Sequence, residues 1–235
     1  MRLHRFYITE NIGDKKEVSI ASTELINQIR NVFRLKENDS VIIFDGSGFD
    51  YECSIICLTK NEVLLKVNKK EASRYMPTRD IFLCVGIVKK DTFEWIVEKA
   101  TELGVTHIIP IMAERSEKKF LNEARLKKIA IEASEQSGRG NVPVIEKIMT
   151  IEEVFRGEAS RPRLEIMVFH TDGERVLSRP RLEDIEVFIG PEGGWSPNEI
   201  EVFHKNNADI YCLGKQVLRS ETAVIAALSQ VVFNN

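Results

Sequence analysis

Beyond residue 77 the chain alternates apolar, strand-like runs with amphipathic helical patterns, and this alternation constrains the fold most strongly. It favours an α/β fold, in which a largely parallel sheet is covered by helices. Helix ends are signalled by Gly104, by Gly138 and by a capping box at Ser196 followed by Pro197. The pattern predicts strands at 81–88, 107–111, 164–169, 185–189 and 210–213, and helices at 91–103, 123–137, 197–205 and 221–233.

The first seventy or so residues follow a different pattern, which predicts a small β-rich unit. Strands are expected at 40–44, 49–58 and 61–67, and apolar residues at helical spacing after Ser22 predict one short helix ahead of them. A polar stretch at 69–77 ends in a proline, which seldom lies inside a helix or strand. We therefore expect two domains, residues 1–72 and 73–235.

Composition excludes several classes of protein. The net charge of −3 argues against a uniformly basic nucleic-acid coat, so any RNA contact must come from Lys and Arg gathered locally. The four cysteines form no CxxC pair or Cys/His metal spacing, which predicts reduced thiols and no metal. Neither a signal peptide nor an apolar run of membrane length is present, so we expect a cytoplasmic protein.

Ligands of open α/β sheets collect at the carboxyl ends of the strands, which here are followed by three unusual loops. After Ile189 comes Gly190-Pro191-Glu192-Gly193-Gly194-Trp195-Ser196, whose glycines allow a close backbone approach to a ligand. A tight strand-to-helix turn explains this loop about equally well when it is taken alone. A phosphate cradle is a further alternative, although no GxxxxGK[ST] motif accompanies the loop.

The other two loops follow neighbouring predicted strands. Leu213-Gly214 leads through Arg219 and a Ser220 cap into the last helix, and His170-Thr171-Asp172-Gly173 follows the strand at 164–169. Purely structural roles are commonplace for the charged residues among them. Two glycine-bearing loops side by side can nevertheless enclose a flat heterocycle read by backbone groups, and adenine fits that description.

The first two loops, read together, resemble the RsmE family of SPOUT methyltransferases. The resemblance is carried by Gly190-Pro191-Glu192-Gly193-Gly194 and by Leu218-Arg219-Ser220-Glu221-Thr222-Ala223. It extends over nearly the whole chain through Arg5-Phe6, Asn31-Val32-Phe33-Arg34-Leu35, Lys99-Ala100-Thr101-Glu102-Leu103-Gly104-Val105, Glu114-Arg115-Ser116 and Glu135-Gln136-Ser137-Gly138-Arg139. Gln28, Asn38 and Gln216 depart from residues common in that family.

This resemblance implies an N-terminal PUA-like β-barrel that helps to hold RNA, and a C-terminal SPOUT domain with a deep trefoil knot. It further implies a homodimer that uses S-adenosylmethionine to methylate N3 of a uridine in 16S ribosomal RNA of the small subunit. The terminal helix, with apolar residues beyond one stripe, agrees with burial in a dimer. By motif position the donor-binding residues are Phe169, His170, Gly190, Glu192, Gly193, Gly194, Leu213, Gly214, Val217, Leu218 and Thr222.

The chemistry of uracil methylation suggests catalytic candidates within these motifs. Loss of the N3 proton leaves a charge that a fixed cation can stabilise, for which Arg219 is the first choice. Glu221 or Glu192 could accept the proton. Phe6, Tyr7 or Trp195 could offer an aromatic face to an extracted base, although core packing is expected for Phe6. The candidate RNA contacts are Arg2, Arg5, Arg30, Arg34, Arg115 and Arg139.

A different class of function remains open at this point. A non-enzymatic RNA-binding dimer would use the β-rich unit to grip RNA and the α/β domain only to dimerise. Calorimetry with S-adenosylmethionine separates that alternative from an enzyme.

Overall fold

The computed structural model describes residues 3–116, 120–158, 165–173 and 184–233, and these form two compact units. The N-terminal unit comprises Met1–Met76 together with Ser134–Val142, and the C-terminal unit comprises Pro77–Ala133 and Pro143–Asn235. In the described residues, no helix is both long and apolar enough to cross a membrane. All four cysteines are free thiols, two of them buried.

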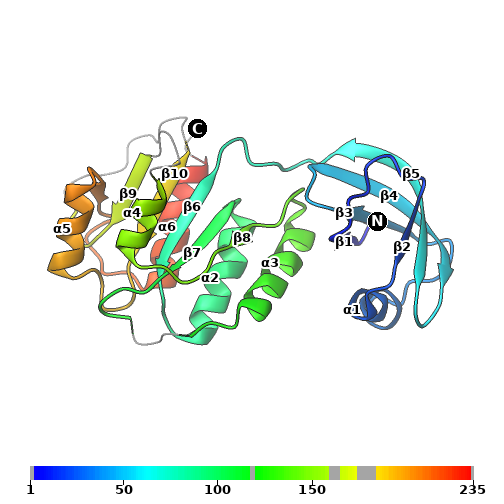
Figure 1. Ribbon diagram of the computed structural model, residues 1–235, viewed down its shortest axis with the longest axis horizontal. Coiled ribbons are helices and arrows are strands. Elements are labelled where there is room, and N and C mark those ends of the chain that lie inside the picture. Colours follow the sequence, from blue (N-terminus) through cyan, green and yellow to red (C-terminus); the bar gives the residue numbers. More distant parts are fainter. Residues whose placement is uncertain (1–2, 117–119, 159–164, 174–183, 234–235) are drawn as a thin grey trace. The chain divides into compact units, whose positions relative to one another are not determined.

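The N-terminal unit is built on a five-stranded sheet in the order β1-β3-β4-β5-β2 (Figure 1). The central strands β3 (Ser40–Phe44) and β4 (Phe49–Leu58) match the prediction, whereas β1 (Arg5–Tyr7) and β2 (Glu17–Ile20) were not predicted. Strands of three or four residues are too short to show an alternating pattern. Apolar side chains from all five strands meet in one buried core with Ile26 and Ile29.

Strand β5 (Val63–Ala72) runs further than expected, into the polar stretch at 69–77 where the domain boundary was predicted. Its second half pairs with β4 in antiparallel register, with Lys70 opposite Tyr51 and Glu71 opposite Asp50. The backbone ladder continues there while the side chains face solvent. Hydropathy alone therefore missed the end of this strand, because strand pairing needs no apolar side chains.

The single helix predicted after Ser22 has two parts. Helix α1 (Thr23–Asn27) begins where the Ser22 hydroxyl accepts a hydrogen bond from Leu25 N at 3.4 Å, and a π-helix, η1 (Gln28–Val32), follows directly. A π-turn carries more residues than an α-turn, so it rotates the following residues off the apolar stripe. Accordingly Ile29 is fully buried, whereas Val32 is 63% exposed.

The C-terminal unit contains the predicted parallel sheet, with six strands in the order β11-β9-β10-β6-β7-β8. Strand β10 lies at its centre, with Ile185 opposite Ile81 of β6 and Glu165 of β9. Because every pair is parallel, the carboxyl ends of the strands meet along one edge of the sheet. The strands are β6 (Ile81–Gly86), β7 (His107–Ile111), β8 (Val144–Ile145), β9 (Glu165–Phe169), β10 (Ile185–Ile189) and β11 (Asp209–Tyr211).

Helices cover both faces of this sheet (Figure 1). On one face, α4 (Ile151–Glu158) and α5 (Pro197–Lys205) enclose an aromatic core around Phe188. On the other, α2 (Lys90–Glu102) packs against α6 (Ser220–Phe233), and α6 contacts β10. Helix α3 (Glu123–Ser137) has the predicted bounds.

Several elements of this unit differ from the prediction. The short strand β8 and helix α4 were not predicted, and β11 begins one residue earlier and ends two residues earlier than expected. Leu164, the expected first residue of β9, lies outside the described residues. The earlier end of β11 adds Cys212 and Leu213 to the loop that follows it, beside the candidate site.

Candidate functional site

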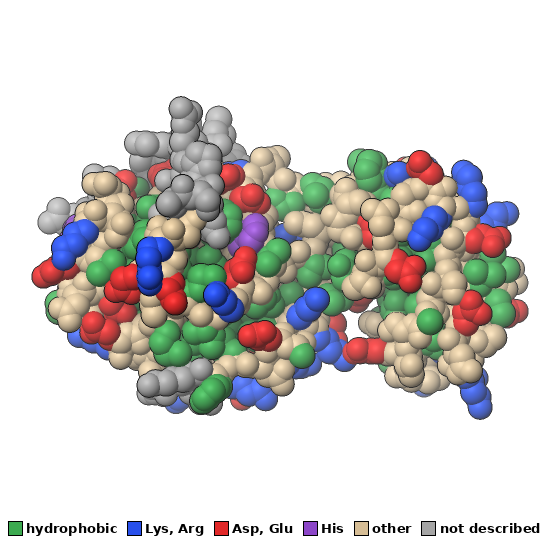
Figure 2. Space-filling model, in the orientation of Figure 1, with side chains coloured by type: hydrophobic (Ala, Val, Ile, Leu, Met, Phe, Trp, Pro, Cys, Tyr) green, Lys and Arg blue, Asp and Glu red, His purple; other side chains and the backbone are tan. Residues whose placement is uncertain are grey.

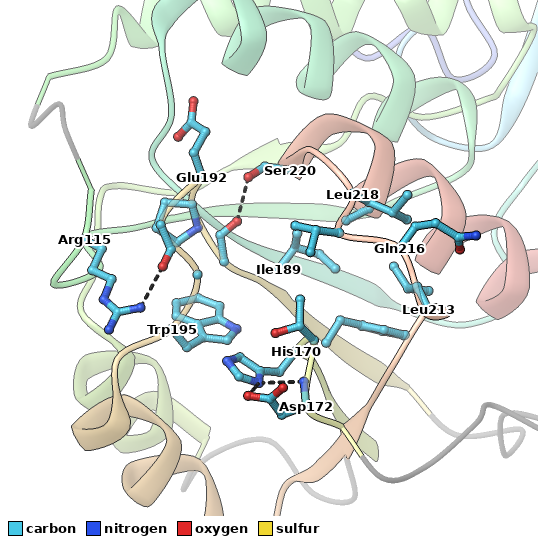
Figure 3. Close-up of a pocket in the computed structure, with 18 of the residues that line it drawn as sticks. Arg115, His170, Asp172, Ile189, Glu192, Trp195, Leu213, Gln216, Leu218 and Ser220 are labelled. Carbon is cyan, nitrogen blue, oxygen red and sulfur yellow. Dashed lines mark hydrogen bonds and ion pairs between the residues drawn. The ribbon is translucent and has the colours of Figure 1, made fainter.

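A cavity of about 390 Å³ opens at the carboxyl ends of β9, β10 and β11 in the C-terminal unit (Figure 3). Its walls come from residues 169–172 after β9, residues 189–195 after β10, residues 213–218 after β11, and the start of α6. This is the edge at which parallel sheets bind ligands. The lining residues are Arg115, Phe169, His170, Thr171, Asp172, Ile189, Gly190, Pro191, Glu192, Gly193, Gly194, Trp195, Leu213, Gly214, Gln216, Val217, Leu218, Ser220 and Ala223.

The loop formed by residues 190–196 is held from both sides by hydrogen bonds to its carbonyl groups. Arg115 Nη1 donates to the Gly193 carbonyl at 2.8 Å, and the Ser220 hydroxyl donates to the Gly190 carbonyl at 3.0 Å (Figure 3). Ser220 was predicted to cap the last helix, but it is the first residue of α6, and its hydroxyl holds this loop instead. These contacts fix the loop before any ligand is present, which reduces the entropy lost on binding.

The end of the same loop is anchored by the buried carboxylate of Glu199. Glu199 Oε2 accepts from Ser196 N at 2.7 Å and the Ser196 hydroxyl accepts from Glu199 N at 3.2 Å, which confirms the predicted capping box. The other oxygen, Oε1, accepts from Glu114 N at 2.9 Å. One side chain therefore ties the start of α5 to the chain after β7, next to Arg115.

Two glycines are required by the local geometry of the site. Gly194 has φ of +66°, a conformation that other residues rarely adopt. Gly86, at the end of β6, faces the loop, and a Cβ there would lie 2.5 Å from Pro191 N and Cδ. Close backbone packing of β6 against the 190–196 loop thus depends on glycine at position 86.

His170 lies at the end of β9 with its ring facing the pocket (Figure 3). Its Nδ1 accepts a hydrogen bond from Asp172 N at 3.2 Å. A ring nitrogen that accepts carries no proton, so in the neutral imidazole the proton lies on Nε2. Nε2–H is then a hydrogen-bond donor at the cavity.

The predicted donor-binding residues gather at this cavity with one exception. All but Thr222 line it, and Thr222 is exposed on α6. Of the three candidate catalytic residues, Glu192 lines the cavity, whereas Arg219 and Glu221 do not. Arg219 is exposed, and it stands between the lining residues Leu218 and Ser220.

The candidate RNA-binding arginines lie in different environments. Arg115 lines the cavity, and Arg30 and Arg34 are exposed at η1 and just after it, where Arg34 has φ of +55°. Arg2 lies outside the described residues. Figure 2 shows basic and acidic side chains interspersed over the face in view, as the small net charge suggests.

In the N-terminal unit, by contrast, Arg139 is buried and the side chain of Arg5 is only 6% exposed. Arg5 donates to the carboxylate of Asp50 and, at 3.0 Å, to the Arg139 carbonyl. Arg139 is 4% exposed, donates from Nε to Asn141 Oδ1 at 3.1 Å, and has its pKa lowered to about 10 by burial. Both side chains therefore have structural partners that the sequence pattern did not indicate.

The aromatic candidates are packed differently from one another. Phe6 is fully buried, as expected, and Trp195 is 2% exposed, so neither ring presents a free face for a base. Tyr7 is half-buried, and its backbone N–H donates to Glu135 Oε1 at 2.8 Å. Trp195 belongs instead to the wall of the cavity, next to Gly194 in the loop motif.

Comparison with known proteins agrees with this geometry. The family model described as an RNA methyltransferase domain matches residues 75–232, and the model of an RNA methyltransferase PUA domain matches residues 26–68. Ribosomal RNA small subunit methyltransferase E of Rickettsia conorii is 31% identical to this chain, with 98% of this chain and 96% of the relative covered. The Bacillus subtilis protein of the same name is 30% identical, with the same coverage.

Solved structures show the same fold over nearly the whole chain. The ribosomal RNA small subunit methyltransferase E from Neisseria gonorrhoeae, which is bound to S-adenosyl methionine, superposes with a TM-score of 0.88 at 27% identity, covering 97% of this chain and 96% of that one. A methyltransferase from Legionella pneumophila gives a TM-score of 0.86 at 25% identity, with the same coverage. These matches cover both units, and the chain belongs to the ribosomal RNA small subunit methyltransferase E family.

Proposed function

We propose that this chain transfers a methyl group from S-adenosylmethionine to N3 of a uridine in 16S ribosomal RNA of the small subunit. One observation carries the proposal: two adjacent glycine-bearing loops enclose a cavity lined by nearly all the residues that the family motifs indicate for the donor. Family membership and the donor-bound Neisseria structure give independent support.

The cavity fits the methyl donor in size and chemistry. Its volume of about 390 Å³ falls within the range of small-molecule sites. Apolar side chains of Ile189, Leu213 and Leu218 suit a flat heterocycle, and the glycine loops present backbone donors and acceptors for its edge. The carboxylates of Asp172 and Glu192 suit a ligand that carries a sulfonium and an ammonium group.

When bound, the donor supplies an electrophilic methyl carbon, which forms a bond to uracil N3 as its bond to sulfur breaks and a neutral thioether remains. The residues of this chain have to orient the two reactants and manage the N3 proton. Arg219, at the cavity rim, would stabilise the negative charge on the uracil carbonyls. Glu192 or Glu221 would accept the N3 proton directly or through a water molecule.

We further propose that residues 1–72 hold RNA as a PUA-like barrel and that residues 73–235 form the SPOUT methyltransferase domain. Arg30, Arg34 and Arg115 are the exposed or cavity-lining cations best placed to contact phosphate or base. Arg5 and Arg139 would act by shaping the N-terminal unit. Half-buried Ile225 and Val232 and exposed Phe233 on α6 support a homodimer, and the rRNA substrate supports a cytoplasmic location.

A deep trefoil knot at the site is also part of the proposal. Two distant backbone segments pass very close there, since a Cβ on Gly173 would lie 2.3 Å from the Tyr211 carbonyl carbon. Residues 174–183 lie outside the described residues. A crystal structure that follows the chain from 170 to 235 tests the knot by the order of its crossings.

The decisive experiment for the activity maps N3-methyluridine in 16S rRNA from cells that lack this gene. We expect one site to lose its modification and a plasmid copy of the gene to restore it. A matched assay with purified protein, labelled donor and either free 16S rRNA or small subunits then identifies the substrate. Full modification in the deletion cells would remove the proposed activity.

A further inference from the structure

Trp195 is held rigidly in the wall of the cavity. Its ring packs edge to face against Phe203, with centroids 5.2 Å apart and an interplanar angle of 72°, and against Phe188 at 6.5 Å and 66°. Only 2% of the side chain is exposed. Edge-to-face packing on two sides fixes the rotation of an indole, so the direction of its N–H is fixed as well.

This rigid indole has an unused hydrogen-bond donor. Trp195 Nε1 is buried, and it has no hydrogen-bond partner within the described part of the chain. A buried N–H without a partner is unfavourable, because it has lost water and gained nothing in exchange. Folded proteins keep few such groups, and each one calls for an explanation.

The nitrogen-bearing edge of the ring faces the ligand loop. A Cβ on Gly190 would lie 3.4 Å from Trp195 Cε2, the ring carbon bonded to Nε1. Figure 3 shows the indole nitrogen on the side of the ring turned toward the interior of the pocket and toward His170. Glycine at position 190 thus leaves this edge clear of a side chain from that position.

We propose that the Trp195 indole N–H donates a hydrogen bond to an acceptor atom of S-adenosylmethionine held in this cavity, which makes Trp195 a positioning residue for the donor. This inference rests on the proposed function. Because the nitrogen is screened from water, the bond forms with little solvent competition, which strengthens it. The indole N–H can donate a hydrogen bond but cannot accept one. The cavity therefore favours a ligand that has an acceptor atom beside it.

Nuclear magnetic resonance tests the bond directly. The chain has two tryptophans, and the other, Trp95, lies on α2 outside the cavity lining and is 40% exposed. The Trp95→Phe variant therefore leaves a single indole N–H signal. We expect S-adenosylmethionine to move that proton signal downfield and to slow its exchange with water. An unmoved signal at saturating donor would overturn the inference.

An isosteric replacement measures the contribution of the bond. In the Trp95→Phe background, biosynthetic incorporation of a tryptophan analogue with sulfur in place of N–H changes position 195 alone and keeps the ring shape. Calorimetry should show donor binding weakened about tenfold, as expected for one lost hydrogen bond. The melting temperature of the free protein should hold or rise, because the analogue removes an N–H that is buried without a partner.

The two arms also separate this inference from the function on which it rests. Equal affinity for S-adenosylmethionine with tryptophan and with the analogue would exclude the proposed role of Trp195. The proposed enzymatic activity would remain. Failure of the folded Trp95→Phe protein to bind S-adenosylmethionine would exclude both the role of Trp195 and the proposed function.

Discussion

At the scale of single residues, Arg219 has the most specific proposed role. It is exposed between two cavity-lining residues, so its guanidinium can face a guest base without supporting the donor pocket. Arg219→Ala should lower single-turnover methyl transfer about 100- to 1000-fold, as the loss of a charge-stabilising donor does elsewhere. Donor affinity by calorimetry should stay unchanged.

The control for this substitution is Lys205→Ala, which removes an exposed cation at the end of α5, away from the cavity. It should leave the rate unchanged. Wild-type turnover in the Arg219→Ala protein would exclude the proposed role.

Asp45 in the N-terminal unit links stability to pH. Its carboxylate accepts hydrogen bonds from Ile12 N at 2.8 Å and from Ser47 N at 3.0 Å. Burial raises the pKa of Asp45, but these hydrogen bonds, together with one from the Ser47 hydroxyl, outweigh burial and lower the pKa overall. A lowered pKa in the folded state gives stability that is complete above the ordinary aspartate pKa and is lost as pH falls through the lowered value.

The measurement compares the melting temperatures of wild type and Asp45→Asn from neutral pH into the acid range. We expect the variant to melt lower at neutral pH and the difference to shrink as the wild-type carboxylate is protonated. A difference independent of pH would mean that the charge of Asp45 contributes nothing.

At the scale of elements, the contact between β6 and the 190–196 loop sets the shape of the cavity. Gly86→Ala places a methyl group 2.5 Å from Pro191 N, and neither backbone can yield without moving the loop. Overpacking of this kind typically destabilises by about 1–3 kcal/mol. We expect lower unfolding free energy in urea and weaker donor binding in the same variant.

Gly157→Ala is the matched control, because a Cβ at that position in α4 meets no atom within 4 Å. Its unfolding free energy should be unchanged or slightly higher, since alanine favours a helix over glycine. Equal effects of the two substitutions would refute the steric argument.

The elements also show what sequence reasoning could reach. Helix α3 was predicted with its bounds because burial of one face leaves a regular pattern, and β10 because a short continuous apolar run marks a strand buried on both faces. The loops that line the cavity were predicted because glycines and helix-capping residues follow the strands in the sequence. The π-turn at Gln28–Val32 was missed, since α- and π-helical residues have the same composition and differ only in hydrogen bonding.

At the scale of the whole molecule, contacts between residues far apart in the sequence could not be predicted from the sequence pattern. Arg5 and Arg139 carry charges that usually face solvent, and only the fold brings them together across 134 positions. Arg115 was predicted as an RNA contact, and nothing local indicates its bond to Gly193. Trp195 was predicted as an aromatic face for a base, and nothing local indicates its burial against Phe188 and Phe203.

Residues 134–142 pack with the N-terminal unit although they follow the first 57 residues of the C-terminal one, Pro77–Ala133. The chain therefore passes between the units more than once, and no single cleavage yields two intact pieces. A fragment truncated after Met76 would deprive Tyr7 of its Glu135 acceptor and Arg5 of the Arg139 carbonyl. Isolating the N-terminal unit thus calls for a graft of the 134–142 segment rather than a simple truncation.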